Sequence, residues 1–98
     1  MLFAVLFTDK PGQGTLRIAQ LAAHIAWVDA HKEQVLVAGS LRENPADVPK
    51  GGLWVVQATD KAAVHALMQT DPFCTCGLRQ SVEVLHWNKA LENHQALI

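Results

Sequence analysis

The chain has 98 residues and a net charge of −1, with eight Lys and Arg against nine Asp and Glu. A chain of this length predicts a single domain over 1–98, with a core over about 1–88 and a polar tail over 89–98. No run of basic residues offers the clustered positive charge that nucleic acids require, so nucleic acid is not an expected partner.

Membrane contact is not expected either. No stretch approaches the ~20 apolar residues that cross a bilayer. The apolar segment 1–7 lacks the length, the basic flank and the cleavage site of a signal peptide. The sequence therefore predicts a cytoplasmic protein.

The first half of the chain contains two predicted strands and one predicted helix. An apolar run over 2–7 has the length and the Pro-Gly ending of a buried strand. The segment 15–32 has no Gly or Pro and is rich in Ala, Leu and Ile, so it predicts a helix with Thr15 or Gly14 as its N-cap. The apolar residues at 35–40 predict a second strand.

The second half contains a long loop, two further predicted strands and a second predicted helix. A segment with several Pro and Gly over 41–52 predicts a long loop, and loops of that length are often functional. Strands are predicted over 53–58 and 82–87, a helix over 61–69, and a turn region over 71–77. The order β-α-β-β-α-β, with right-handed crossovers, predicts a ferredoxin-like α+β fold.

In this fold, two helices cover one face of a four-stranded antiparallel sheet, and the other face needs a separate cover. The strands over 2–7 and 35–40 contain almost no polar side chains, whereas a sheet with one wet face alternates apolar and polar residues. The hydrophobic fraction of 50% is also high for a small soluble monomer. We therefore predict a homodimer in which a second copy covers this sheet face.

One side of the predicted helix over 15–32 carries polar side chains. Arg17, Gln20, His24 and His31 follow one another at intervals of three, four and seven residues, which places them on one narrow side. Two interpretations remain open: a solvent-facing edge, or the border of a cleft in which His24 is a general base. Histidine suits that task because it exchanges a proton near neutral pH.

The turn region contains a second candidate. Asp71 followed by Pro72 is a favourable N-cap and N1 pair for a short helical turn. The alternative interpretation is that Asp71 accepts the ring N–H of His24, as the carboxylate does in a catalytic triad. That alternative depends on the fold bringing the turn region close to the helix.

Cys74 and Cys76 are expected to be reduced thiols, because one intervening residue would strain a disulfide between them. Their spacing also differs from the C-x₂₋₄-C of zinc sites, and no histidine lies at a ligand spacing from them. No metal and no cofactor is therefore expected.

Several short features occur together in a set order: Arg17 seven residues before His24, Ala38-Gly39-Ser40-Leu41, and Asp71-Pro72-Phe73 with Gly77 after it. A Pro- and Gly-containing loop, a Val-rich strand and a last strand ending in Trp87 complete the set. Over 1–88 the chain thereby resembles the YciI-like (YCII-related) proteins. The resemblance implies a dimeric α/β barrel of the ferredoxin-like type, with a His–Asp pair in its active site that corresponds to His24 and Asp71.

The resemblance also implies a reaction class. Relatives of similar fold include muconolactone isomerases, and one member is a dehydrochlorinase acting on a chlorinated hydroxyhydroquinone. We therefore expect cofactor-independent lyase, dehalogenase or isomerase chemistry on a small cyclic molecule, with His24 as general acid or base and Asp71 orienting it. Substrate binding is expected from Arg17, Ser40 and Phe73.

Two departures from the family pattern concern the pocket. Ser40 stands where the family usually has proline, which adds a hydroxyl. Leu21 stands where an arginine often precedes the histidine, which removes a charge.

Two other functions stay open. A binding or accessory module would hold a metabolite in the same pocket without turnover, and the lack of a nucleophile motif favours it. A haem- or ring-degrading monooxygenase on the same dimeric barrel ranks last, because the chain offers no specific residues for it.

Overall fold

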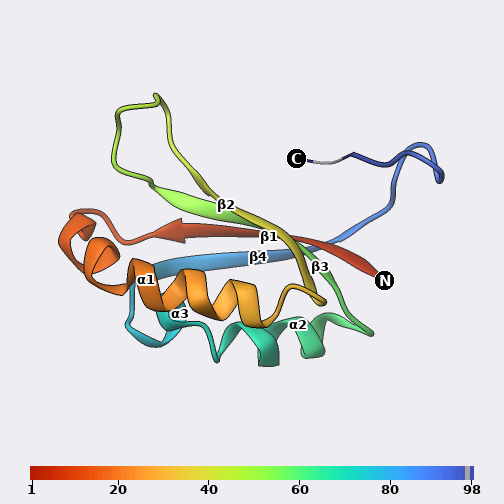
Figure 1. Ribbon diagram of the computed structural model, residues 1–98, viewed down its shortest axis with the longest axis horizontal. Coiled ribbons are helices and arrows are strands. Elements are labelled where there is room, and N and C mark those ends of the chain that lie inside the picture. The colour runs from red at the N-terminus through yellow and green to blue at the C-terminus, as the bar shows by residue number, and fades with distance from the viewer. Residues whose placement is uncertain (97) are drawn as a thin grey trace.

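The computed structural model describes residues 1–96 and 98, and it has two layers (Figure 1). One layer is an antiparallel sheet in the order β2-β3-β1-β4, and the helices lie below it in this view. The predicted ferredoxin-like α+β fold is thus confirmed. In chain order the elements are β1 (Leu2–Asp9), α1 (Gly14–Ala30), β2 (Val35–Leu41), β3 (Gly51–Gln57), α2 (Lys61–Met68), α3 (Pro72–Thr75) and β4 (Arg79–Trp87).

Several boundaries differ from the predictions. β3 begins at Gly51 and β4 at Arg79, earlier than expected, because backbone pairing with β1 extends beyond the apolar runs. The predicted N-cap of α1 is wrong, since the helix begins at Gly14 and Gln13 is its N-cap. Part of the predicted turn region forms the one-turn helix α3. Within the described residues, no helix has the length and apolarity that a membrane crossing requires.

The core lies between the sheet and the helices. Alternate side chains of β1 point towards the helices, and Phe3, Val5 and Phe7 are buried there. Trp54 of β3 is 1% exposed and stacks on Trp27 of α1, with ring centroids 5.2 Å apart. Each such side chain contributes roughly 1.5–3 kcal/mol of burial free energy, so this cluster anchors α1 on the sheet.

α1 buries polar side chains and exposes apolar ones, which is the reverse of most surface helices. Its buried residues are Arg17, His24 and Trp27, whereas Ile18 and Ile25 are 77% and 57% exposed. The interpretation of the polar stripe as a solvent-facing edge is therefore wrong. An amphipathic helix normally buries its apolar side, so buried polar groups here need partners within the protein.

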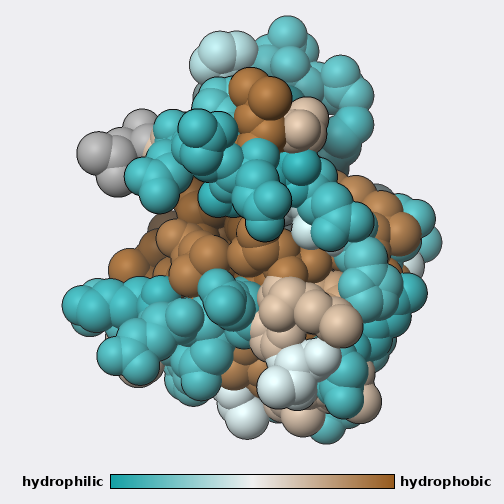
Figure 2. Space-filling view, turned by 90° about the vertical axis from the view of Figure 1, so that its right-hand side faces the viewer, coloured by the Kyte–Doolittle hydropathy of each residue, from teal (hydrophilic) through white to brown (hydrophobic). Residues whose placement is uncertain are grey.

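The sheet face away from the helices, which we call the open face, has no helix over it in the described chain (Figure 1). Residues paired across neighbouring strands share a face, which assigns to the open face the apolar residues Leu2, Ala4, Leu6, Val37, Leu41, Leu53, Val55, Leu85 and Trp87. The loop 42–50 and the segment 88–96 rise on this side of the sheet. Figure 2 shows a band of apolar surface set into a hollow between hydrophilic regions.

Gly51→Ala is expected to lower the free energy of unfolding by about 1–3 kcal/mol, the usual cost of overpacking. A Cβ at this position would overlap the carbonyl oxygen of Phe7, so β1 and β3 would have to separate. Chemical denaturation measures the change. The matched control is Gly14→Ala, whose Cβ meets Val48 at an ordinary 3.6 Å. Equal losses of stability in the two variants would contradict this prediction.

Candidate active site

His24 and Asp71 meet where α1 packs on α3. The Nδ1 atom of His24 lies 2.7 Å from Oδ1 of Asp71, which is a hydrogen-bond distance. His24 is 8% exposed and Asp71 is fully buried. The structure thus brings together the two residues for which the sequence predicts a paired role, although 47 positions separate them in the chain.

Asp71 also stabilises the start of α3. Its Oδ1 accepts the backbone N–H of Phe73 at 3.2 Å, and Pro72 occupies the N1 position, where a missing N–H costs no hydrogen bond. Both interpretations of Asp71 therefore hold at once: it caps a helix and it contacts His24. The Asp-Pro pair determines the local turn, and the packing of α1 then brings His24 to the carboxylate.

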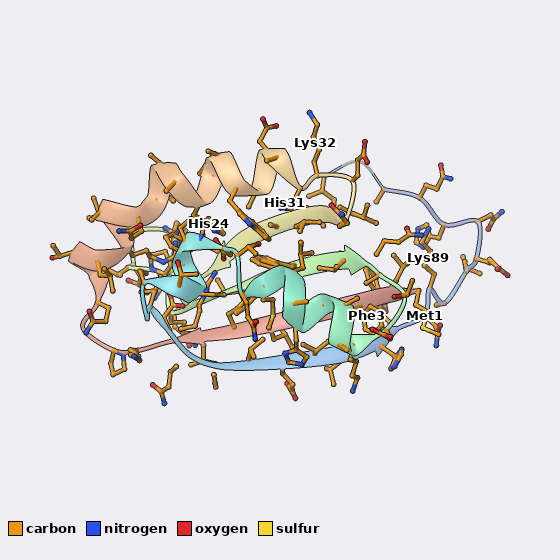
Figure 3. The ribbon with its side chains drawn as sticks, turned by 90° about the horizontal axis from the view of Figure 1, so that it is seen from below. Met1, Phe3, His24, His31, Lys32 and Lys89 are labelled. Carbon is orange, nitrogen blue, oxygen red and sulfur yellow. The ribbon has the colours of Figure 1, made fainter. Side chains whose placement is uncertain are left out.

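The imidazole of His24 lies against aromatic rings. The ring of Phe73 is nearly parallel to it, with centroids 4.0 Å apart and an interplanar angle of 11°, and Trp54 is 6.5 Å away. Figure 3 shows His24 on the side of α1 that lies next to α3. Phe73 restricts the ring plane and Asp71 binds Nδ1, while Nε2 has no hydrogen-bond partner among the described residues.

A second buried cluster of charges lies beside the first. Asp9, at the end of β1, accepts hydrogen bonds from Nε of Arg17 at 3.3 Å and from Nη1 of Arg79 at 2.7 Å. Arg17 also donates to the carbonyl oxygen of Gly51 at 3.2 Å. Burial lowers the pKa of the Arg17 guanidinium, and the carboxylate of Asp9 opposes that shift. Both guanidinium groups lie within cation–π distance of Phe73.

A cavity of about 430 Å³ lies between α1 and the edge strand β2, a size typical of small-molecule sites. Four of the five predicted site residues line it: Arg17, His24, Ser40 and Phe73. The fifth residue, Asp71, does not line the cavity and contacts it only through His24. Ser40 is exposed on β2, and its hydroxyl accepts a hydrogen bond from Nη2 of Arg42 at 2.7 Å. Arg42 lines the cavity as well.

A larger cleft of about 890 Å³ lies where the β1–α1 connection approaches the loop before β3. It includes Arg17 but neither His24 nor Phe73, so we place the candidate site in the smaller cavity. In the part of the chain that the structure describes, no group of three or more His, Cys, Asp and Glu is placed to hold a metal ion.

Sequence reasoning does not identify Arg79, which lines the cavity from β4. Successive side chains of a strand point to opposite faces of the sheet, and Val84 is buried on the helix side. Arg79 lies five positions before Val84, so regular alternation would place its side chain on the open face. The pairing of β1 with β4 shifts by one residue after Thr8: Thr8 pairs with Ser81 and Asp9 pairs with Arg79, which leaves Gln80 without a partner on β1. The side chains of Asp9 and Arg79 therefore both lie on the helix side of the sheet. Such a bulge depends on strand pairing and leaves no clear signal in a single sequence.

Fold and site together define the class: a small ferredoxin-like α+β domain with a buried His–Asp pair beside a cavity. The chain belongs to the YCII-related domain family, whose model matches residues 1–88, and the family resemblance is thereby confirmed. None of the curated proteins compared with the chain matches it.

Among solved structures, the chain is similar to 5-chloro-2-hydroxyhydroquinone dehydrochlorinase of Burkholderia phenoliruptrix AC1100 in complex with 2,5-dihydroxybenzoquinone. The TM-score is 0.81 at 29% identity, over 90% of this chain and 94% of that chain. A candidate antibiotic biosynthesis monooxygenase of Bacteroides thetaiotaomicron has a TM-score of 0.60 at 18% identity, over 99% and 95% of the two chains. A protein of Pseudomonas aeruginosa has a TM-score of 0.53 at 19% identity, over 92% and 93%. The last two similarities concern the fold alone.

Cys74 is expected to resist iodoacetamide at about pH 8 in the folded protein. Burial, and then the carboxylate of Asp71, whose Oδ2 lies 3.8 Å from the sulfur, raise the pKa of the Cys74 thiol to about 12. Only about one thiol in ten thousand is then ionised, and the thiolate is the reactive form. Peptide mass spectrometry measures the labelling, with urea-unfolded protein as the control. Labelling of Cys74 at the unfolded rate in the native protein would show that the site is more open than described.

Proposed function

We propose that this protein is a cofactor-independent enzyme of the lyase or isomerase type, in which His24 and Asp71 act as a general acid–base pair on a small cyclic molecule. The observation that carries the proposal is the 2.7 Å contact between Nδ1 of His24 and Asp71 beside a cavity. A histidine oriented by a buried carboxylate is an arrangement that serves proton transfer in enzymes.

The hydrogen bond to Asp71 determines which ring nitrogen reacts. An ionised carboxylate only accepts hydrogen bonds, so the proton of the neutral imidazole lies on Nδ1 and the lone pair on Nε2. Nε2 then takes a proton from a substrate in the cavity, and Asp71 stabilises the imidazolium that forms. Isomerisation returns this proton to a different atom of the substrate, whereas elimination releases it to solvent after the leaving group departs. Phe73 holds the ring plane throughout.

Similarity to the dehydrochlorinase supports this reaction class, at a TM-score of 0.81 and 29% identity. Dehydrochlorination removes one proton and one chloride from the same molecule. The electron pair left by the proton forms the new π bond as the carbon–chlorine bond breaks, so no added oxidant or reductant is needed. One positioned base accounts for such a step, and a chlorinated hydroxyhydroquinone is the first substrate to test.

His24→Asn is expected to lower kcat/KM for chloride release from 5-chloro-2-hydroxyhydroquinone by about 10²–10⁴-fold, because the amide still reaches Asp71 but carries no transferable proton. Asp71→Asn is expected to act in the same direction, since Nδ1 then faces a neutral group. Chloride release measured over time gives the rates. The matched control is His65→Asn, a change at an exposed histidine of α2, which keeps wild-type activity.

Two outcomes would contradict the proposal. Equal turnover by the wild type and His24→Asn would remove His24 from the reaction. A wild-type protein that binds the compound and returns it unchanged would instead favour a non-catalytic binding module.

We also propose that the protein is a homodimer joined through the open face. Leu53, Leu85 and Trp87 are 37%, 43% and 43% exposed on it, and a contiguous apolar surface of this kind marks an interaction site. Burial of this apolar surface in a dimer would contribute about 25 cal/mol per Å². Part of that gain is offset by the translational and rotational freedom that the two chains lose on binding.

Leu85→Lys is expected to dissociate this dimer, since a charge on the open face would be buried without a partner. Light scattering after gel filtration should give the 10.7 kDa mass of one chain for the variant and twice that mass for the wild type. Ile18→Lys is the matched control, because Ile18 is 77% exposed on α1, in the other layer. A monomeric wild type, or dissociation of both variants, would refute the proposed interface.

A further inference from the structure

The arginine side chains around the cavity beside His24 carry more positive charge than nearby carboxylates neutralise. Three guanidinium groups line it, those of Arg17, Arg42 and Arg79, and no carboxylate within the described residues does. Asp9 pairs with both Arg17 and Arg79, so one carboxylate serves two buried cations. A buried charge without a counter-charge is costly, which makes an anion in this cavity a favourable occupant.

Arg42 adds to this surplus from the rim of the cavity. Its Nη2 donates to the hydroxyl of Ser40 at 2.7 Å, and its Nη1 donates to the backbone carbonyl of Asp47 at 3.3 Å. Both partners are neutral oxygens. The charge of Arg42 is therefore free to act on a molecule in the cavity.

Arg79 has hydrogen-bonding capacity that the protein does not use. Its side chain is 8% exposed, Asp9 supplies its one oxygen partner within the described residues, and the thiol of Cys74 lies close to it. Its Nε is buried with no partner in that part of the chain, although a guanidinium has five N–H donors. The group lies near the rings of Phe7 and Phe73, 4.3 and 5.1 Å from their centroids, which hold its position.

The other walls of the cavity suit a flat, apolar molecule. The parallel rings of His24 and Phe73 form part of the lining, together with Trp54. Ile18 and Ile25 of α1 border the cavity with apolar side chains, and both are exposed. A planar ring can stack in such surroundings while a polar substituent reaches the guanidinium groups.

We propose that Arg79, supported by Arg42, is an anion-binding residue, and that the cavity takes a flat ring bearing an ionised oxygen such as a phenolate or enolate. This inference rests on the proposed function in one respect, namely that the cavity beside His24 is the substrate site. A fixed guanidinium next to the ionised oxygen stabilises the negative charge that grows on the ring when Nε2 of His24 removes a proton.

Binding of 4-nitrophenol, compared with 4-nitroanisole, tests the inference without any turnover. The two probes share a flat shape, but only the phenol can ionise, and its phenolate is followed by visible absorbance. The wild type should bind the phenolate about tenfold or more tightly than the anisole, as expected for a charge-assisted hydrogen bond. Arg79→Met should lose this preference, and Lys61→Met, which removes an exposed charge from α2, should keep it.

Two further variants guard against a folding defect in Arg79→Met. Arg79→Lys keeps a positive charge beside Asp9 but loses the planar group, and Arg42→Gln changes an exposed residue after β2. Each should fold, as judged by circular dichroism, and each should lose part of the preference for the phenolate. A full preference in folded Arg79→Met, or equal binding of both probes by the wild type, overturns the anion-binding role.

Failure of this inference is distinguishable from failure of the proposed function. His24→Asn removes one ring of the cavity lining and should weaken both probes alike, so the preference for the phenolate over the anisole should remain, because that preference needs no proton transfer. If Arg79→Met loses the preference while His24→Asn turns substrate over at the wild-type rate, the anion subsite stands and the general-base role fails. If Arg79→Met keeps the preference while His24→Asn is inactive, the subsite fails and the general-base role stands.

Discussion

The carboxylate of Asp71 is completely enclosed by protein, and its need for hydrogen-bond donors organises the centre of the molecule. A buried carboxylate without partners would cost several kcal/mol. The backbone N–H of Phe73 and the ring of His24 meet that need, so one side chain starts α3, orients an imidazole and joins α1 to α3. The same carboxylate helps to keep the neighbouring Cys74 protonated. The hydrogen bond between His24 and Asp71, on which the proposed proton transfer depends, therefore also satisfies a buried carboxylate of the fold.

Asp9 imposes a second constraint of the same kind at the other end of the site. It binds Arg17 from α1 and Arg79 from β4, and Arg17 reaches on to the backbone of Gly51 in β3. Three parts of the fold are thus tied to the end of β1. Because one carboxylate binds two guanidinium groups, positive charge remains beside the cavity. The residues that form these structural ion pairs, Arg17 and Arg79, thus also line the cavity of the proposed anion site.

These two carboxylates explain why α1 buries polar side chains and exposes apolar ones. Arg17 and His24 point inward because their partners, Asp9 and Asp71, lie inside. Ile18 and Ile25 are exposed and border the cavity with apolar surface. A helix pattern taken alone favours the opposite orientation, since apolar burial is the usual driving force. The buried hydrogen-bond partners of Arg17 and His24 account for the reversed orientation here.

The sequence by itself determined the order of the elements and the class of fold, because apolar runs, Gly- and Pro-containing breaks and the Asp71-Pro72 cap act over a few neighbouring residues. It also made candidates of His24, through the polar stripe, and of Asp71, through the Asp-Pro pair, and the family resemblance, which the match over residues 1–88 bears out, implied that the two form a pair. Tertiary structure alone decided that these two residues touch, and that Arg79 joins the cavity. The reason is physical: a bulge at Gln80 reverses the direction of Arg79, and such a shift in strand register depends on pairing between segments 70 residues apart.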